Sequence, residues 1–217
     1  MLKKKLMKKY IAEFIGTFAL VFFGTGAIIV NQQTEGSLGL LGISLTFGII
    51  ISVMIYVFGS ISGAHLNPAV TISLAVGKLI PKNEIIAYLL AQVFGSISAS
   101  SILRLLFIES ISLGETQPSG EIFQSFWLEL ILTFFLMLTI LVVTSKKELS
   151  NLTGIIIGLM VTAMILFAGS ISGGSFNPAR SIGPALISGN LTALWVYIIA
   201  PISGAVLAMF TLIIFKK

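Results

Sequence analysis

The chain has 217 residues, of which 56% are hydrophobic and only 10% are charged, and its formal net charge is +5. A soluble domain contains roughly 25% charged residues, so this composition cannot cover a surface in water and indicates an integral membrane protein. There is no cysteine, which excludes disulfides, thiolate metal sites and cysteine nucleophiles.

Six apolar segments have the length that a membrane-spanning helix needs, which is about 20 mostly apolar residues. They are expected at approximately 10–30, 39–59, 84–107, 122–144, 150–169 and 192–215. The basic start MLKKKLMKKY resembles the first part of a signal peptide, but no small-residue cleavage site follows the apolar run. We therefore expect an uncleaved first span. Because the connections are short, the sequence predicts a single domain over residues 1–217.

The lysines are distributed unevenly between the two sides that six spans would define. They occur at 3–9, 78, 82, 146–147 and 216–217. The connections at 31–38, 109–121 and 188–191 contain none. The positive-inside rule therefore predicts that both termini are cytoplasmic, and a cell membrane (inner or plasma) is the expected location. This placement explains the net charge without a nucleic-acid partner.

The sequence also repeats itself. EFIGTF at 13–18 matches ELILTF at 129–134, and GSISGAHLNPAV at 59–70 matches GSISGGSFNPAR at 169–180. Each half contains three expected spans, and since three is odd, the second half must enter the membrane from the opposite side. Inverted repeats of this kind place their working site near the midplane, in broken helices. The halves are expected at approximately 1–108 and 109–217.

The two similar stretches predict short helices that cross half of the membrane. After Phe58 the glycines and serines favour an irregular turn, and Asn67-Pro68 then offers a preferred N-cap followed by a preferred first helical residue. About eleven residues of helix span roughly 16 Å, half of a ~30 Å hydrocarbon core. The second half-helix is expected from Pro178 to about Gly189, so the two N-termini should meet near the centre.

This arrangement predicts an aqueous path. Irregular backbone at membrane depth must be buried in protein or line a wet cavity. Each helix N-terminus carries about half a positive charge, so two of them aimed at one point oppose cations, including a hydrated proton. The amide groups of Asn67 and Asn177 can cap the helices with their oxygens and donate towards the cavity with their NH₂ groups. Such a path suits a small, neutral, hydrogen-bonding solute.

The paired Asn-Pro-Ala motifs, in two inverted three-span halves, resemble the major intrinsic protein family of aquaporins and glycerol facilitators. The resemblance implies an all-α membrane fold of six transmembrane helices and two re-entrant half-helices, no cofactor or metal, no enzymatic activity, and a homotetramer in the lipid bilayer. It also implies pore-lining backbone carbonyls before each motif. The motif residues are Asn67, Pro68, Ala69, Asn177, Pro178 and Ala179. The expected carbonyls belong to Gly63, Ala64, His65, Gly173, Gly174 and Ser175.

The family's selectivity filter, carried over by spacing from the two asparagines, falls on Phe47, Ile165, Gly174 and Arg180. An arginine within the membrane is costly and should face a cavity; snorkelling to the interface is the alternative. Water-selective members typically have histidine in place of Ile165 and often cysteine or threonine in place of Gly174. The resemblance therefore implies a wider, more apolar filter than that of a strict water pore.

Five further positions that separate the family's subgroups give a mixed pattern. They fall on Phe107, Ser181, Ala185, Tyr197 and Ile198. The mixture resembles the plant nodulin-26-like group and some prokaryotic relatives, which pass glycerol-like polyols or neutral metalloid acids as well as water. A strictly water-selective aquaporin is the alternative.

Several polar residues have two interpretations. Glu13 and Glu129 are expected to accept backbone N–H bonds from the re-entrant loops, although a proton relay is possible for intramembrane carboxylates. His65 is expected to contribute its carbonyl rather than act as a pH gate, and Arg104 to snorkel rather than anchor a loop. An ion-coupled secondary transporter also uses broken helices, but the chain has no aspartate and few candidates for a coupling site.

Overall fold

The computed structural model describes residues 2–215, and that part of the chain is helical with short connections. The elements are α1 (Leu2–Gln33), α2 (Gly39–Ser62), α3 (Pro68–Val76), α4 (Lys82–Leu106), α5 (Ile122–Ser145), the 3₁₀-helix η1 (Lys147–Leu152), α6 (Thr153–Ser172), α7 (Pro178–Ser188) and α8 (Leu194–Phe215). Lys216 and Lys217 of the predicted basic set lie outside the described residues.

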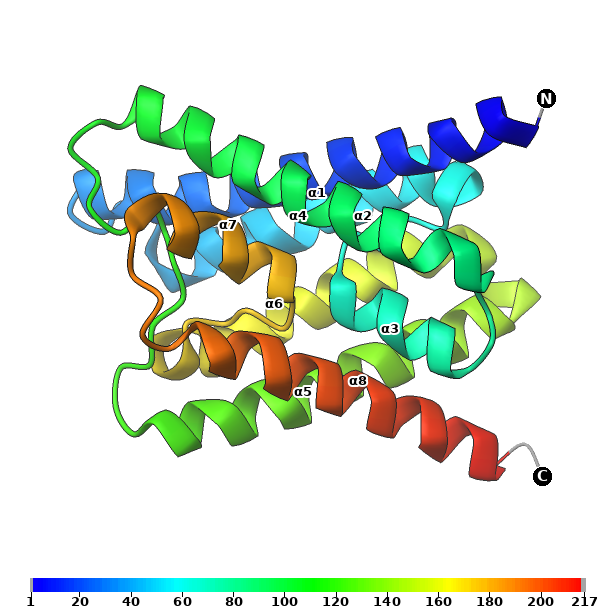
Figure 1. Cartoon of the computed structure of the whole chain (residues 1–217). Coiled ribbons are helices and arrows are strands. Elements are labelled where there is room, and N and C mark those ends of the chain that lie inside the picture. Colours follow the sequence, from blue (N-terminus) through cyan, green and yellow to red (C-terminus); the bar gives the residue numbers. More distant parts are fainter. Residues whose placement is uncertain (1, 216–217) are drawn as a thin grey trace.

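Within residues 2–215, six helical segments are long and apolar enough to cross a membrane, while α3 and α7 have only 9 and 11 residues. Figure 1 shows α3 and α7 inside the bundle, with the two chain ends and the α5–α6 connection at the same end of the molecule. The predicted all-α fold, with six spans, two half-helices and inverted three-span halves, is confirmed.

The two halves pack in the same way. Helix α1 lies against α4 in the first half, α5 lies against α8 in the second, and α2 and α6 join the halves. A methyl group at Gly95 would overlap the carbonyl oxygen of Phe14, and one at Gly204 would overlap that of Leu130. Each half therefore uses one glycine to bring its first and third spans into backbone contact.

The two long helices before the half-helices end later than the sequence predicts. The prediction places the end of α2 near Phe58, but the helix continues through Gly59 to Ser62. Gly63 then adopts φ +91° and its N–H bonds to the carbonyl of Gly59. A glycine in the left-handed conformation is a common helix C-cap. Gly59 has no close neighbour from another element, and α2 tolerates it at a cost of about 1 kcal/mol relative to alanine.

Polar and apolar side chains are distributed inversely to those of a soluble protein. Glu13, Glu129 and Gln92 are fully buried, whereas many large apolar side chains are exposed on the outside. Examples on the outer surface are Phe23, Ile49, Phe94, Phe167 and Phe210. This apolar outer surface matches a lipid environment. The buried polar groups lie towards the centre, where the half-helices meet.

Candidate functional site

The backbone before each half-helix follows an irregular path that repeats in both halves. Ala64 and Leu66 have φ values of +46° and +51°, and their counterparts Gly174 and Phe176 have values of +60° and +54°. A left-handed conformation costs a residue with a Cβ roughly 1–2 kcal/mol. Side chains of the surrounding helices must therefore hold these loops in place.

Glu13 of α1 holds the first loop. Its carboxyl group accepts hydrogen bonds from the backbone N–H groups of His65 and Leu66, at 2.9 and 2.8 Å, and from the hydroxyl of Ser62 at 2.6 Å. Gln92 of α4 adds a fourth donor at 2.8 Å. These contacts occupy both carboxyl oxygens with donors from the loop's own half of the chain.

Glu129 of α5 makes the equivalent contacts with the second loop. It accepts from the N–H groups of Ser175 and Phe176 at 2.9 and 2.6 Å, and from the Ser172 hydroxyl at 2.9 Å. The Tyr197 hydroxyl donates to the Ser172 carbonyl at 2.6 Å. A side chain engaged by three fixed donors has little freedom to carry protons or bind a coupling ion, which argues against the transporter alternative.

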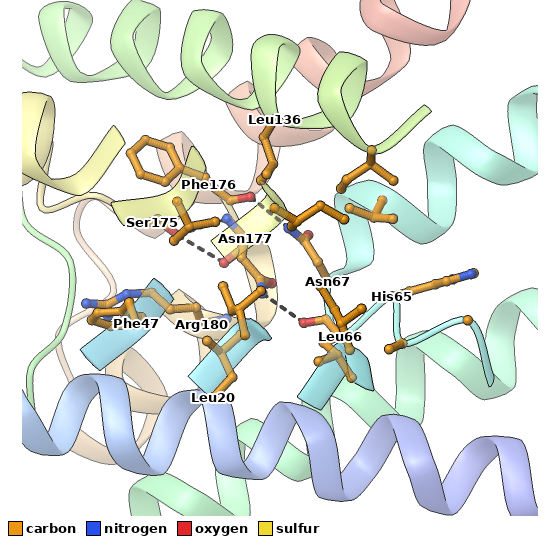
Figure 2. Close-up of a pocket in the computed structure, with 18 of the residues that line it drawn as sticks. Leu20, Phe47, His65, Leu66, Asn67, Leu136, Ser175, Phe176, Asn177 and Arg180 are labelled. Atoms are coloured by element: carbon orange, nitrogen blue, oxygen red, sulfur yellow. Dashed lines mark hydrogen bonds between the residues drawn. The ribbon is translucent and has the colours of Figure 1, made fainter. Parts of the chain in front are cut away.

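The two asparagines join the halves at the centre (Figure 2). Their side-chain oxygens cap α3 and α7, accepting from Ala69 N–H at 2.9 Å and from Ala179 N–H at 3.0 Å. Each NH₂ group also donates across the pseudo-two-fold axis at 2.8 Å, from Asn67 to the Phe176 carbonyl and from Asn177 to the Leu66 carbonyl. These crossed bonds were not predicted from the sequence, and they leave one N–H of each amide for the cavity.

A cavity of about 250 Å³ runs past these asparagines. Both of them line it, as do the four residues carried over as the filter and most of the residues expected to present carbonyls. Gly173 is not among the described residues that line the cavity, and instead lies against the backbone of Gln117. The remaining wall is mostly aliphatic, with Thr144, Thr153 and Phe176 as exceptions. It includes Leu20, Ile51, Ile55, Val70, Leu74, Leu136, Ile140, Ile157 and Val161.

Arg180 of α7 is 1% exposed and lies beside this cavity, not at the membrane interface. Its Nη1 donates to the carbonyl of Gly114 at 2.8 Å, and its guanidinium carbon lies 5.2 Å from the centre of the Phe47 ring. Nε and Nη2 are buried and have no hydrogen-bond partner among the residues that the structure describes. Because unpaired buried donors are costly, these two N–H groups are available to a solute in the cavity.

The connection between α4 and α5 contributes more to the site than the sequence suggested. Besides supplying Gly114, it places the Thr116 hydroxyl 2.7 Å from that of Ser181, which lies 2.6 Å from the hydroxyl of Ser175. Ser175 donates in turn to the Asn177 carbonyl at 2.9 Å. Nothing in the sequence pattern of this polar connection indicated which of its residues would reach the half-helix.

The role of Arg104 also differs from the one that the sequence predicts. The sequence favoured snorkelling, but its guanidinium donates to the carbonyls of Ser110 and Ile111, which makes it an anchor of the α4–α5 connection. Among the subgroup positions, Ser181 and Tyr197 bond to the second loop or its helix cap. Phe107, Ala185 and Ile198 are not among the described residues that line the cavity.

Two half-helices meeting end to end, with a cavity beside their N-termini and six spans around them, define a membrane channel. The family model of the major intrinsic proteins matches residues 1–212. The chain therefore belongs to the major intrinsic protein family, which confirms the resemblance drawn from the Asn-Pro-Ala motifs.

Individual relatives agree with the nodulin-26-like pattern. The chain is 45% identical to "Aquaporin NIP1-3" of Oryza sativa subsp. japonica, over 95% of this chain and 73% of that protein. It is 39% identical to "Nodulin-26" of Glycine max, over 92% of this chain and 74% of the relative. The solved aquaglyceroporin of Plasmodium falciparum has a similar structure, with a TM-score of 0.86, 30% identity and 94% coverage of both chains.

Proposed function

We propose that this protein is a passive channel that conducts water and small uncharged solutes, including glycerol-like polyols. The observation that carries the proposal is the composition of the cavity wall. Unpaired N–H groups of Arg180 and the amides of Asn67 and Asn177 face a cavity that is otherwise largely aliphatic. A polyol has hydroxyl groups for the polar side of such a wall and C–H groups for the apolar side.

Charge exclusion follows from the same residues. The N-termini of α3 and α7 meet at the centre, and each contributes about half a positive charge. Arg180 adds a full charge near one end. A cation would be repelled at both places, and an anion would lose its hydration against the aliphatic wall, where an unpaired ion is strongly disfavoured. Neutral solutes avoid both penalties.

The assignment of Phe47, Ile165, Gly174 and Arg180 as the selectivity filter belongs to this proposal. Two pairs of these residues are neighbours. The Arg180 guanidinium lies by the Phe47 ring, and a methyl group built on Gly174 would lie 3.4 Å from Ile165. With phenylalanine, isoleucine and glycine at three of the four positions, only Arg180 offers a polar side chain. This favours a polyol, and a neutral metalloid acid is a further candidate, over strict selectivity for water.

Stopped-flow light scattering on proteoliposomes tests the proposal. Water and glycerol fluxes should both exceed those of empty liposomes, have a low activation energy, and be independent of pH or sodium gradients. Ile165→His should lower the ratio of glycerol to water permeability, whereas the volume-conserving Ile165→Leu should retain it. A flux that requires an ion gradient would refute the channel proposal, and complete exclusion of glycerol would refute the filter argument.

We also propose a homotetrameric assembly, a single channel domain over 1–217 and cytoplasmic termini in a cell membrane. The family supports the assembly. The positions of the two chain ends and of the α5–α6 connection, at one end of the molecule (Figure 1), support the topology. Lys4 and Lys8 belong to the first turns of α1, and Lys146 and Lys147 to the α5–α6 connection, so they lie at that end. The positive-inside rule expects such a cluster on a cytoplasmic face.

A further inference from the structure

The pseudo-two-fold axis between the halves is fixed by residues that contact their own counterparts. Gly48 and Gly158 are 110 positions apart, and a methyl group at Gly48 would lie 2.6 Å from the Gly158 carbonyl oxygen, while one at Gly158 would overlap the Gly48 carbonyl. Asn67 and Asn177 have the same spacing and exchange crossed hydrogen bonds. Contacts between self-equivalent positions lie on a two-fold axis, so this axis passes through the middle of the cavity.

The same spacing applies without a gap to the part of the cavity wall formed by α2, α6, the two re-entrant loops and the half-helices. Helices α2 and α6 end at Ser62 and Ser172, which are 110 positions apart and are followed by glycines with φ +91° and +82°. The half-helices begin at Pro68 and Pro178, again 110 apart. A residue at one end of the cavity therefore has a defined counterpart at the other end.

The filter residues give four such counterparts. Adding or subtracting 110 converts Phe47 into Ile157, Ile165 into Ile55, Gly174 into Ala64 and Arg180 into Val70. All four counterparts line the same cavity as the filter residues themselves. The neighbouring pairs of the filter also have counterparts. Arg180 beside Phe47 corresponds to Val70 beside Ile157. Gly174 beside Ile165 corresponds to Ala64 beside Ile55.

We propose that Ile55, Ala64, Val70 and Ile157 form a second selectivity ring, the inner ring, on the opposite side of the asparagine pair from the filter. The inference rests on the proposed channel function and adds a site to it. The side chains of the inner ring contain only carbon and hydrogen, so none of them can hydrogen-bond to a solute; the polar side chains of His65, Thr144 and Thr153 line the same cavity but are not part of the ring. Passage consequently depends on aliphatic bulk and on how readily the solute gives up hydrogen bonds.

This ring has a different selectivity from the filter. The filter offers the donors of Arg180, which compensate for lost hydration, whereas Val70 at the equivalent place offers none. A polyol presents C–H surface to the inner ring. It therefore tolerates the loss of hydration there better than the number of its hydroxyl groups alone suggests. Steric bulk then becomes the main control, and a larger side chain should exclude glycerol before it excludes water.

Two substitutions test the inner ring from opposite directions. Ile55→Phe enlarges the side chain on a cavity-facing turn of α2 and should lower the ratio of glycerol to water permeability. Ala64→Gly removes one methyl group and should raise that ratio, by up to about tenfold if the methyl group is felt as strongly as one in a binding pocket. Because Ala64 has φ +46°, glycine is favoured there and the variant should fold.

Val57→Phe is the matched control, because Val57 lies on the same helix but is exposed on its outer surface. Ile165→Phe is the counterpart of Ile55→Phe at the filter. All variants are reconstituted at equal protein amounts and measured with water and glycerol. Ratios that fall in Ile55→Phe, rise in Ala64→Gly and stay unchanged in Val57→Phe support the inner ring.

The inference is overturned if Ile165→Phe changes the ratio while Ile55→Phe and Ala64→Gly both match the parent. It is also overturned if Ile55→Phe lowers both fluxes by the same factor and Ala64→Gly has no effect, because that result describes a structural role. The parent's own fluxes report on the proposed function. A parent that conducts neither solute refutes the channel, and the inner ring with it.

Discussion

Replacing Glu129 with glutamine should destabilise the second half of the channel while changing few atoms. The carboxyl group accepts three hydrogen bonds, from Ser172, Ser175 and Phe176, and two of these come from the backbone of the second re-entrant loop. Glutamine keeps one oxygen and replaces the other with an NH₂ group. If that NH₂ takes the position of Oε2, the Phe176 N–H loses its acceptor and faces another donor.

The expected cost follows from the burial of this site. Glu129 is 0% exposed and Phe176 is 2% exposed, so water cannot replace the missing acceptor. A buried donor left without a partner costs about 1–3 kcal/mol, and more where the lost partner was charged. Phe176 also has φ +54°, so the loop has an intrinsic tendency to relax. Its relaxation would displace the Phe176 carbonyl from Asn67 and narrow the cavity.

The assay has two parts: thermal unfolding of the purified protein in detergent, and water permeability in proteoliposomes. Glu129→Gln should unfold at a lower temperature and conduct less water for each folded molecule. Glu121→Gln is a matched control, because that glutamate lies on the surface at the start of α5. If Glu129→Gln unfolds and conducts like the parent, the carboxyl group does not hold the loop, and the argument from its hydrogen bonds is wrong.

Two further predictions test packing and the α4–α5 connection. Gly204→Ala should lower the unfolding temperature strongly, because the added methyl group would overlap the Leu130 carbonyl. Gly120→Ala should have little effect, because the nearest neighbour of its methyl group would lie 3.8 Å away. Equal unfolding temperatures of the two variants would refute the close α5–α8 packing. Thr116→Val should change the ratio of glycerol to water permeability, whereas Thr116→Ser should keep the parent's ratio, because only the hydroxyl reaches Ser181. If the Val variant has the parent's ratio, this hydroxyl does not position the loop.

The fold was largely predictable because its determinants are local and periodic. Apolar length sets the spans, and an asparagine followed by proline sets the start of each half-helix, as Asn67-Pro68 and Asn177-Pro178 do. The repeat then determines the inverted arrangement by counting alone. The end of α2 was misplaced because Gly59 and Gly63 look alike in sequence. Only the fold shows that Gly59 lies within a packed helix and Gly63 at its end.

The site was predictable only in part, because some of its contacts come from backbone that no motif marks. The cavity receives Phe47, Ile165, Gly174 and Arg180 as the spacing suggested. The acceptor for Arg180, however, is the carbonyl of Gly114 in an irregular connection, and any residue type can supply a carbonyl. Arg104 was misassigned for the same reason, since its partners are also carbonyls of that connection.

The two halves share a framework and differ in what they present to the cavity. In each half, the residue two before the asparagine contacts the residue four after it. His65 lies 3.1 Å from the Thr71 hydroxyl, and Ser175 lies 2.6 Å from that of Ser181. The backbone therefore takes the same path whether an imidazole or a hydroxyl supplies the contact.

This tolerance explains how a duplicated fold can have two different openings. The glutamates, the capping asparagines and the glycines that close the helix packing must stay alike, because each half needs the same loop geometry. Side chains that face only the cavity are released from that requirement. Val70 and Arg180 occupy equivalent positions in the two half-helices, and one offers methyl groups where the other offers a buried charge. Under the two proposed assignments, a neutral solute that crosses the molecule meets a filter selective for its hydrogen-bonding groups and an inner ring selective for its apolar bulk.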